Sequence, residues 1–211
     1  MNEAFKDILQ NYDLNTADCS IEPIGSGLVH QTFLIRGKKQ FVLQKINTAI
    51  FKSPEQIAKN IKACKNYLNE THPEYLFVGF KPTRENLAYA IVNGNYWRLS
   101  PFVKNSITLD LLNNPSLAFE AAKAFGQLAK YLNDIPTENF EATIPDFHNL
   151  SYRFEQFQHA LENGISEKIN QSKELIYFYK SQKRIADVFE EIKNESLFPL
   201  RIQHHDTKIN N

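Results

Sequence analysis

The sequence predicts an α+β fold, with an antiparallel sheet in its first half and helices in its second. Between residues 20 and 46, three short apolar-rich segments alternate with turns, a pattern typical of an antiparallel meander. Residues 53–71 carry apolar side chains at helical spacing behind a clear start signal. Beyond residue 103 the spacing is helical almost throughout. We therefore expect two structural parts, residues 1–103 and residues 104–211.

Composition narrows the class of protein. The 211 residues are 42% hydrophobic, enough for a packed core, and the 24 basic and 24 acidic side chains cancel. Charge therefore gives no reason to expect nucleic acid or an anionic membrane surface as a partner. The chain has no apolar run of bilayer-spanning length and no signal-peptide pattern. Cys19 and Cys64 do not form a disulfide framework, so the expected compartment is the cytoplasm.

The first part is expected to hold most of the strands. The first three predicted strands are residues 20–24, 29–35 and 40–46, and Gly25-Ser26-Gly27 turns between the first two.

A helix with a marked beginning follows these strands. Ser53 is its expected N-cap, Pro54 its first residue, and Gln56 the partner of a capping box. A strand over residues 75–80 is expected next, and then a hairpin of residues 87–92 and 96–103 around Asn93-Gly94-Asn95.

The second part is expected to be mainly helical. Asn114-Pro115 predicts the start of a helix whose apolar side chains share one face: Leu117, Ala121, Phe125, Leu128 and Leu132. The remaining expected elements are a loop over 144–149, helices over 151–162 and 166–193 separated by Asn163-Gly164, and a short strand over 197–203.

The strongest indication of chemistry is the spacing H-x-D-x-K-x-x-N at residues 204–211. The carboxylate of Asp206 suits the orientation and deprotonation of an acceptor hydroxyl. Lys208 can offset charge on a transferred phosphoryl group, and the amide of Asn211 can reach a magnesium ion. His204 would brace the loop by hydrogen bonding. The alternative interpretation is a polar tail or a histidine pair that binds adventitious metal.

The glycine turn Gly25-Ser26-Gly27 is a candidate phosphate-binding loop, because glycines let backbone N–H groups approach phosphate oxygens closely. His30 occupies the place of a third glycine, and a strand rather than a helix follows, which argues against a Rossmann dinucleotide site. The alternative interpretation is an ordinary hairpin turn.

Residues 41–45 carry the candidate phosphate-binding cation. In the V-A-I-K register of kinases the cation position falls on Gln44 rather than Lys45, and alternation places these two side chains on opposite faces. Either Gln44 donates a neutral hydrogen bond to phosphate, or a small change of register brings Lys45 in; a solvent-facing lysine is the third possibility. Glu55 can pair with such a cation or simply suit the helix dipole.

A loop at Asp146-Phe147-His148 lies between predicted helices, and its polar side chains are candidates for contact with the acceptor. We take His148 as the candidate substrate-binding residue. A surface loop without function is the alternative.

Four segments together resemble the aminoglycoside-phosphotransferase and choline-kinase superfamily: residues 25–32 (GSGLVHQT), 41–51 (FVLQKINTAIF), 97–103 and 204–211 (HHDTKINN). Within that superfamily, the run FVLQKINTAIFKSPEQ is most similar to the N-acetylhexosamine 1-kinase group. The resemblance spans essentially the whole chain.

The resemblance implies a protein-kinase-like bilobal fold, with residues 1–103 as the N-lobe and residues 104–211 as a partial C-lobe. It implies ATP and Mg²⁺, and transfer of the γ-phosphoryl group to a hydroxyl, which in the N-acetylhexosamine group is the anomeric one. Asp206 would be the base and Asn211 a magnesium ligand. Ser100 and Phe102 would lie at the hinge that binds adenine, where Pro101 limits the available donors. A plain edge strand is the alternative interpretation of residues 97–103.

Such kinases continue well past the catalytic loop to an aspartate that binds magnesium. We therefore expect a truncated chain that is inactive as it stands. Two other interpretations stay open: a kinase of another small acceptor, such as homoserine, choline or an aminoglycoside, and a non-catalytic kinase-like module that binds nucleotide or acts as a scaffold.

Overall fold

The computed structural model describes residues 3–25, 29–109, 111–112, 114–193 and 195–207. The chain forms two compact units, one of residues 1–143 with 201–211 and one of residues 144–200. The second unit is therefore inserted between two stretches of the first. The predicted α+β class is confirmed. The predicted lobe boundary at residue 103 stays a prediction.

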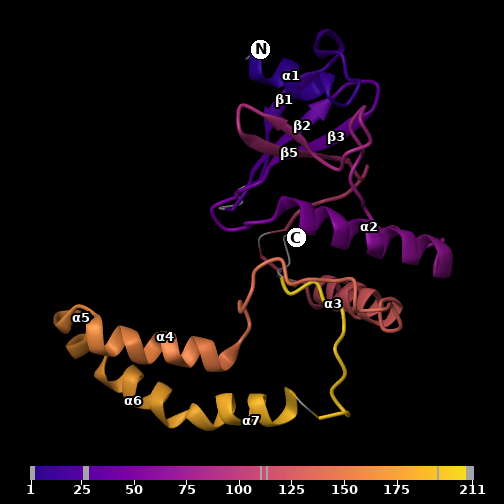
Figure 1. Ribbon diagram of the computed structural model, residues 1–211. Coiled ribbons are helices and arrows are strands. Elements are labelled where there is room, and N and C mark those ends of the chain that lie inside the picture. The colour runs from indigo at the N-terminus through magenta and orange to yellow at the C-terminus, as the bar shows by residue number, and fades with distance from the viewer. Residues whose placement is uncertain (1–2, 26–28, 110, 113, 194, 208–211) are drawn as a thin grey trace. The chain divides into compact units, whose positions relative to one another are not determined.

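The first unit contains a five-stranded antiparallel sheet with the order β1-β2-β3-β5-β4 (Figure 1). Asn93 and Gly94 turn the predicted hairpin with φ values of 50° and 71°, the left-handed conformation that a two-residue hairpin turn requires. The meander and the hairpin predicted from the sequence are thus confirmed. The strands are β1 (Ser20–Pro23), β2 (Gln31–Arg36), β3 (Gln40–Lys45), β4 (Ala90–Val92) and β5 (Asn95–Pro101).

One face of the sheet packs on a helix that the sequence analysis did not predict, α1 (Glu3–Gln10). Its Ile8 and Leu9 are almost fully buried, as are Leu43 and Leu99, which pair across β3 and β5. Successive side chains along a strand point to opposite faces of the sheet. The neighbours of these core residues in the sequence therefore lie on the face away from α1. The remaining sheet residues in the core are Ile35, Phe41, Ala90, Val92 and Trp97.

Helix α2 (Pro54–Thr71) begins where predicted, because the Ser53 hydroxyl accepts a hydrogen bond from the Gln56 N–H at 3.3 Å. The predicted capping box is only half formed. The Gln56 side chain donates to Asn60 Oδ1 at 2.9 Å instead of returning to the cap.

The second apolar core of the first unit lies between α2 and the end of α3 (Pro115–Tyr131). We call its buried residues Cys64, Leu68, Leu132 and Ile135 the α2–α3 cluster. Ile202, from the returning segment, packs against it. Asn114 caps α3 as predicted, with its side chain accepting from the Ser116 N–H at 2.9 Å.

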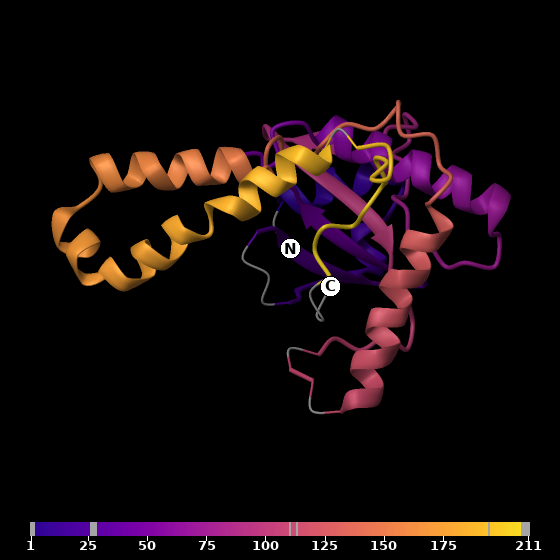
Figure 2. The same ribbon diagram turned by 90° about the horizontal axis from the view of Figure 1, so that it is seen from below.

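The described part of the second unit forms four helices: α4 (Leu150–Asn163), α5 (Ser166–Gln171), α6 (Lys173–Ser181) and α7 (Lys183–Lys193) (Figure 2). Ser151 on α4 donates to Glu190 on α7 at 2.7 Å, and the rings of Phe157 and Tyr179 lie 5.5 Å apart. The predicted single helix over 166–193 is wrong, since Ser172 and Gln182 interrupt it. Within the described part of this unit, only Ala186 is buried.

Two predicted strands do not form. Residues 75–80 form no strand and pair with no described strand of the sheet, and the neighbouring Lys81 makes an isolated bridge to Leu99. Residues 197–203 pair with no described strand, and Leu197 and Leu200 are 84% and 87% exposed.

Both cysteines are free thiols, as expected. Of the helices that the structure describes, none combines the length and the apolar character needed to cross a bilayer.

Candidate functional site

A row of polar side chains crosses three neighbouring strands on the face of the sheet opposite α1. Thr32 on β2 pairs with Gln44 on β3, which pairs with Arg98 on β5. Gln44 Nε2 donates to Thr32 Oγ1 at 3.2 Å. Gln44 Oε1 accepts from Arg98 Nε at 3.0 Å and Arg98 Nη2 at 2.8 Å. The two bonds to one oxygen fix the plane of the guanidinium.

Arg98 is a half-buried cation without a matching anion. No carboxylate among the described residues lies within ion-pair distance of it, and the Phe80 ring centroid lies 4.8 Å from the guanidinium carbon. Burial lowers the pKa of Arg98 to about 10, so the side chain stays protonated at neutral pH. The site is therefore positively charged.

His30 lies shortly after the glycine turn in the sequence and feels the positive charge of Arg98. Its Nδ1 accepts from the Asn47 N–H at 3.2 Å, and its ring stacks on Phe51 at 5.2 Å. Burial lowers the pKa of His30, the charge of Arg98 lowers it further, and a backbone hydrogen bond with Lys45 acts in the opposite direction. A neutral imidazole thus lies within the electrostatic reach of Arg98.

The glycine turn continues the ladder between β1 and β2. The Ile24 N–H donates to the Thr32 carbonyl at 3.0 Å, and Gly25 has φ 78°, a left-handed value that favours glycine. Ser26 and Gly27, the other predicted phosphate-binding residues, lie outside the described residues.

Lys45 does not share the face of Gln44. It pairs with Trp97 in the register of β3 and β5, on the side of the sheet that packs on α1. Glu55 is exposed and forms no ion pair within the described chain. Burial raises the pKa of Tyr89, and the negative charge of Glu55 raises that pKa further. The structure therefore places Lys45 on the face opposite Gln44, and Glu55 pairs with no described cation.

The end of β5 leaves few backbone donors. The Phe102 N–H already donates to the Gln40 carbonyl at 3.1 Å, and Pro101 has none. Ser100 lies in the ladder opposite Val42. Adenine binding at this predicted hinge would therefore rely on carbonyl oxygens, including that of Phe102, and on N–H groups beyond it.

The predicted catalytic loop is described as far as Thr207, so Lys208 and Asn211 lie outside the described residues. The His204 ring lies 5.4 Å from that of Phe125 on α3, and His205 has φ 59°. Asp206 is exposed. Its approach to the glycine turn stays a prediction.

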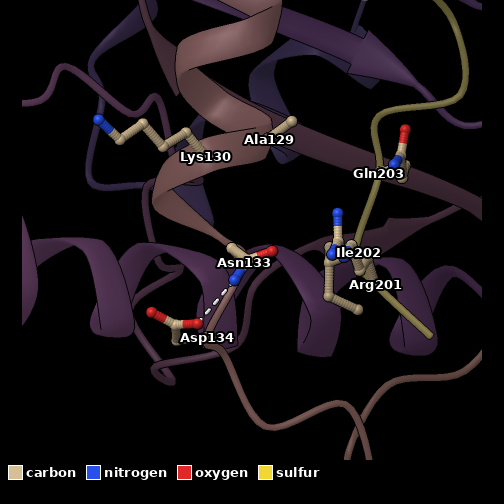
Figure 3. Close-up of a pocket in the computed structure, with 7 residues that line it drawn as sticks. All are labelled: Ala129, Lys130, Asn133, Asp134, Arg201, Ile202 and Gln203. Atoms are coloured by element: carbon tan, nitrogen blue, oxygen red, sulfur yellow. Dashed lines mark hydrogen bonds between the residues drawn. The ribbon is translucent and has the colours of Figure 1, made fainter. Parts of the chain in front are cut away.

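Two hollows lie beside this segment. The larger, about 360 Å³, is lined by the end of α3 and by residues 201–203 (Figure 3). In it, Lys130, Asp134 and Arg201 supply charges of both signs. The smaller, about 220 Å³, is lined in part by His204, His205 and Thr207, so it adjoins the candidate base. Within the described chain, no group of three or more His, Cys, Asp and Glu side chains could hold a metal ion.

His148 belongs to the second unit, whereas Asp206 belongs to the first. The His148 ring meets that of Phe147 edge-on at 4.8 Å. The nearby Asn149 caps α4 by accepting from the Tyr152 N–H at 3.2 Å. The loop therefore has a structural role as a helix start, and its contact with an acceptor stays a prediction.

No known family profile matches the chain. Solved structures do match. An aminoglycoside phosphotransferase from Alicyclobacillus acidocaldarius superposes with a TM-score of 0.50 at 13% identity, over 74% of this chain and 42% of that one. The spectinomycin phosphotransferase APH(9)-Ia, solved with ADP and spectinomycin, superposes with a TM-score of 0.51 at 14% identity, over 92% of this chain and 58% of that one.

The fold is that of the aminoglycoside phosphotransferases. The chain spans about half the length of these structures. In this phosphotransferase fold, the polar row lies on the strands next to the glycine turn. Sequence reasoning missed Arg98 and Phe80. Alternation along β5 already predicts that Arg98 lies on the face opposite Trp97 and Leu99. That Gln44 is the partner of Arg98 follows only from the register between β3 and β5.

Proposed function

We propose that the chain is the nucleotide-binding portion of an ATP-dependent phosphotransferase that acts on a hydroxyl of a small molecule. The observation that carries the proposal is the positively charged row on the sheet next to a glycine turn with left-handed Gly25. Glycine backbone and fixed positive charge suit the oxygens of a triphosphate. The ADP bound to the spectinomycin phosphotransferase supports the same ligand class.

The candidate residues divide into those that bind the nucleotide, those that act on the acceptor and the transferred group, and one that binds magnesium. Gly25, Ser26 and Gly27 would cover the phosphates, and Ser100 and Phe102 would border the adenine. Bound ATP supplies the phosphoryl group. Asp206 would orient the acceptor hydroxyl and take its proton, while Lys208 offsets negative charge at the transferred group. The side-chain amide oxygen of Asn211 suits Mg²⁺, which prefers oxygen ligands.

The favoured acceptor is an N-acetylhexosamine, phosphorylated at its anomeric hydroxyl, and His148 is the candidate contact. This choice is supported by the FVLQKIN run of β3 and the residues after it. An aminocyclitol antibiotic is the second candidate, because the spectinomycin phosphotransferase shares the fold.

Nucleotide binding tests the proposal directly. We expect calorimetric titration of the 211-residue chain with ATP to give saturable binding that tightens when Mg²⁺ is added. A scaffold need bind neither, so the lack of any ATP-dependent heat with and without Mg²⁺ would contradict the proposal.

The acceptor is tested separately, with a non-hydrolysable ATP analogue present. Thermal melting with N-acetylglucosamine, N-acetylgalactosamine, spectinomycin, choline and homoserine should show the largest increase in midpoint with the amino sugars. A larger increase with spectinomycin would reassign the acceptor while leaving the nucleotide proposal intact.

A further inference from the structure

The central strand of the sheet lacks the cation that kinases place there. The V-A-I-K lysine position of β3 holds the neutral Gln44, and the neighbouring Lys45 lies on the opposite face. If the nucleotide proposed above binds on the Gln44 face, its phosphates need positive charge from another element.

Arg98 is directly opposite Gln44, one strand along the sheet. A guanidinium has five N–H donors, and Gln44 Oε1 takes one from Nε and one from Nη2. The Nη1 group has no hydrogen-bond acceptor among the described residues. Donors therefore remain for a ligand, in the planar arrangement that matches the oxygens of a phosphate.

The surroundings of Arg98 favour an anionic ligand. A half-buried charge without a counter-ion is costly, and the Phe80 ring at 4.8 Å compensates only part of the lost hydration. No described carboxylate neutralises it, and the nearby His30 is an acceptor for the Asn47 N–H rather than a second cation. A phosphate oxygen would supply the missing counter-charge.

We propose that the Arg98 guanidinium, held in plane by Gln44, binds the phosphate oxygens of the nucleotide in place of the cation that β3 lacks. Gln44 is then a positioning residue, and Thr32 fixes it in turn by accepting from its Nε2. The inference rests on the nucleotide-binding function proposed above. It assigns the phosphate cation to β5 rather than to β3.

The test compares the affinities of ATP and adenosine in each variant, by calorimetry at fixed Mg²⁺ and salt. The ratio of ATP affinity to adenosine affinity isolates the phosphate contacts, because partial unfolding of a variant weakens the binding of both ligands equally. Arg98→Met keeps the length and removes the charge, and should lower the ratio about 10- to 100-fold, as expected for lost charge-assisted hydrogen bonds. The matched control is Arg36→Met in β2, whose guanidinium pairs with Glu22 at 2.7 Å, and it should leave the ratio unchanged.

A second variant separates binding from a merely structural role. Gln44→Glu keeps the shape of the side chain and gives Arg98 a permanent counter-ion. We expect ATP affinity to fall about tenfold or more while the melting temperature does not fall. If Arg98 only braces the sheet, this variant should leave ATP affinity unchanged.

The possible failures are distinguishable. A parent chain that binds neither ATP nor adenosine overturns the proposed function and this inference together. If the parent chain binds ATP more tightly than adenosine and Arg98→Met keeps the same affinity ratio, the inference alone is overturned. A double variant Gln44→Lys/Arg98→Gln, which returns the cation to β3, should recover ATP preference relative to Arg98→Met.

Discussion

Tyr12 ties the segment after α1 to the sheet. Its hydroxyl donates to the Trp97 carbonyl at 2.7 Å, and its side chain is fully buried. Burial raises the pKa of the phenol well above its usual 10.0, and a backbone hydrogen bond acts in the opposite direction. The folded state therefore holds this proton more tightly than the unfolded chain does. The resulting stability is present below pH 10 and is lost as pH rises beyond it.

Tyr12→Phe tests this account. The variant should lose about 1–2 kcal/mol of unfolding free energy at neutral pH, because the Trp97 carbonyl is left without its partner. Since Phe cannot ionise, the difference between parent and variant should narrow above pH 10. Urea unfolding at neutral and alkaline pH measures it, and a difference that stays constant with pH would contradict the assigned cause.

Leu43 tests the packing of the first core. It is 0% exposed, so Leu43→Ala should lower the unfolding free energy by about 2–5 kcal/mol. The matched control is Ile91→Ala on β4, where the side chain is 57% exposed and the cost should stay below about 1 kcal/mol. Equal losses in chemical denaturation would show that Leu43 does not lie in the core described here.

Sequence reasoning reached only part of the candidate site at the scale of single residues. It recognised that Gln44 replaces a cation, because that follows from the spacing along one strand. The partnership with Arg98 depends on the pairing of β3 with β5, which are separated by α2 and the β4 hairpin strand. Register between distant strands is a property of the whole sheet, so no local pattern reveals it.

At the scale of elements, the helix starts are where sequence and structure agree best. An N-cap is a local event, in which one side chain satisfies an N–H two or three residues ahead. Ser53 and Asn114 do this in α2 and α3, at the positions the sequence predicts.

Removing a cap should have a measurable effect. Ser53→Ala should lower the unfolding free energy by about 0.5–2 kcal/mol, since the Gln56 N–H loses its acceptor. Ser166→Ala is the control, because Ser166 begins α5 without any side-chain cap bond there. Thermal melting of the two variants should show a clear decrease only for Ser53→Ala.

The two strands predicted in error share one cause. Residues 75–80 and 197–203 have strand-like composition, but a strand also needs a partner with free backbone groups. Tyr75 and Phe77 instead pack against the α2–α3 cluster. Helix α1 was missed for the opposite reason: it is short, with Glu3–Gln10 as its bounds, and its stability depends on the sheet beneath it.

At the scale of the whole molecule, the two units differ in how much they bury. The first has two apolar clusters, while the described part of the second buries only Ala186. Opening free energy follows buried contacts, so amides of α4–α7 should open at about 2–4 kcal/mol lower cost than those of β3 and β5. Hydrogen exchange followed by mass spectrometry checks this. Equal protection in both units would show that the second unit has a core of its own.

The insertion of residues 144–200 also bears on the order in which the chain assembles. Ile202 reaches Leu132 and Ile135 only when a long loop closes, and the entropy lost on closure grows slowly with loop length. In the folded chain, the bond between Ser151 on α4 and Glu190 on α7 holds the first and last helices of the insert together. An insert whose first and last helices are paired shortens the effective loop between Leu132 and Ile202, and a shorter loop costs less entropy to close.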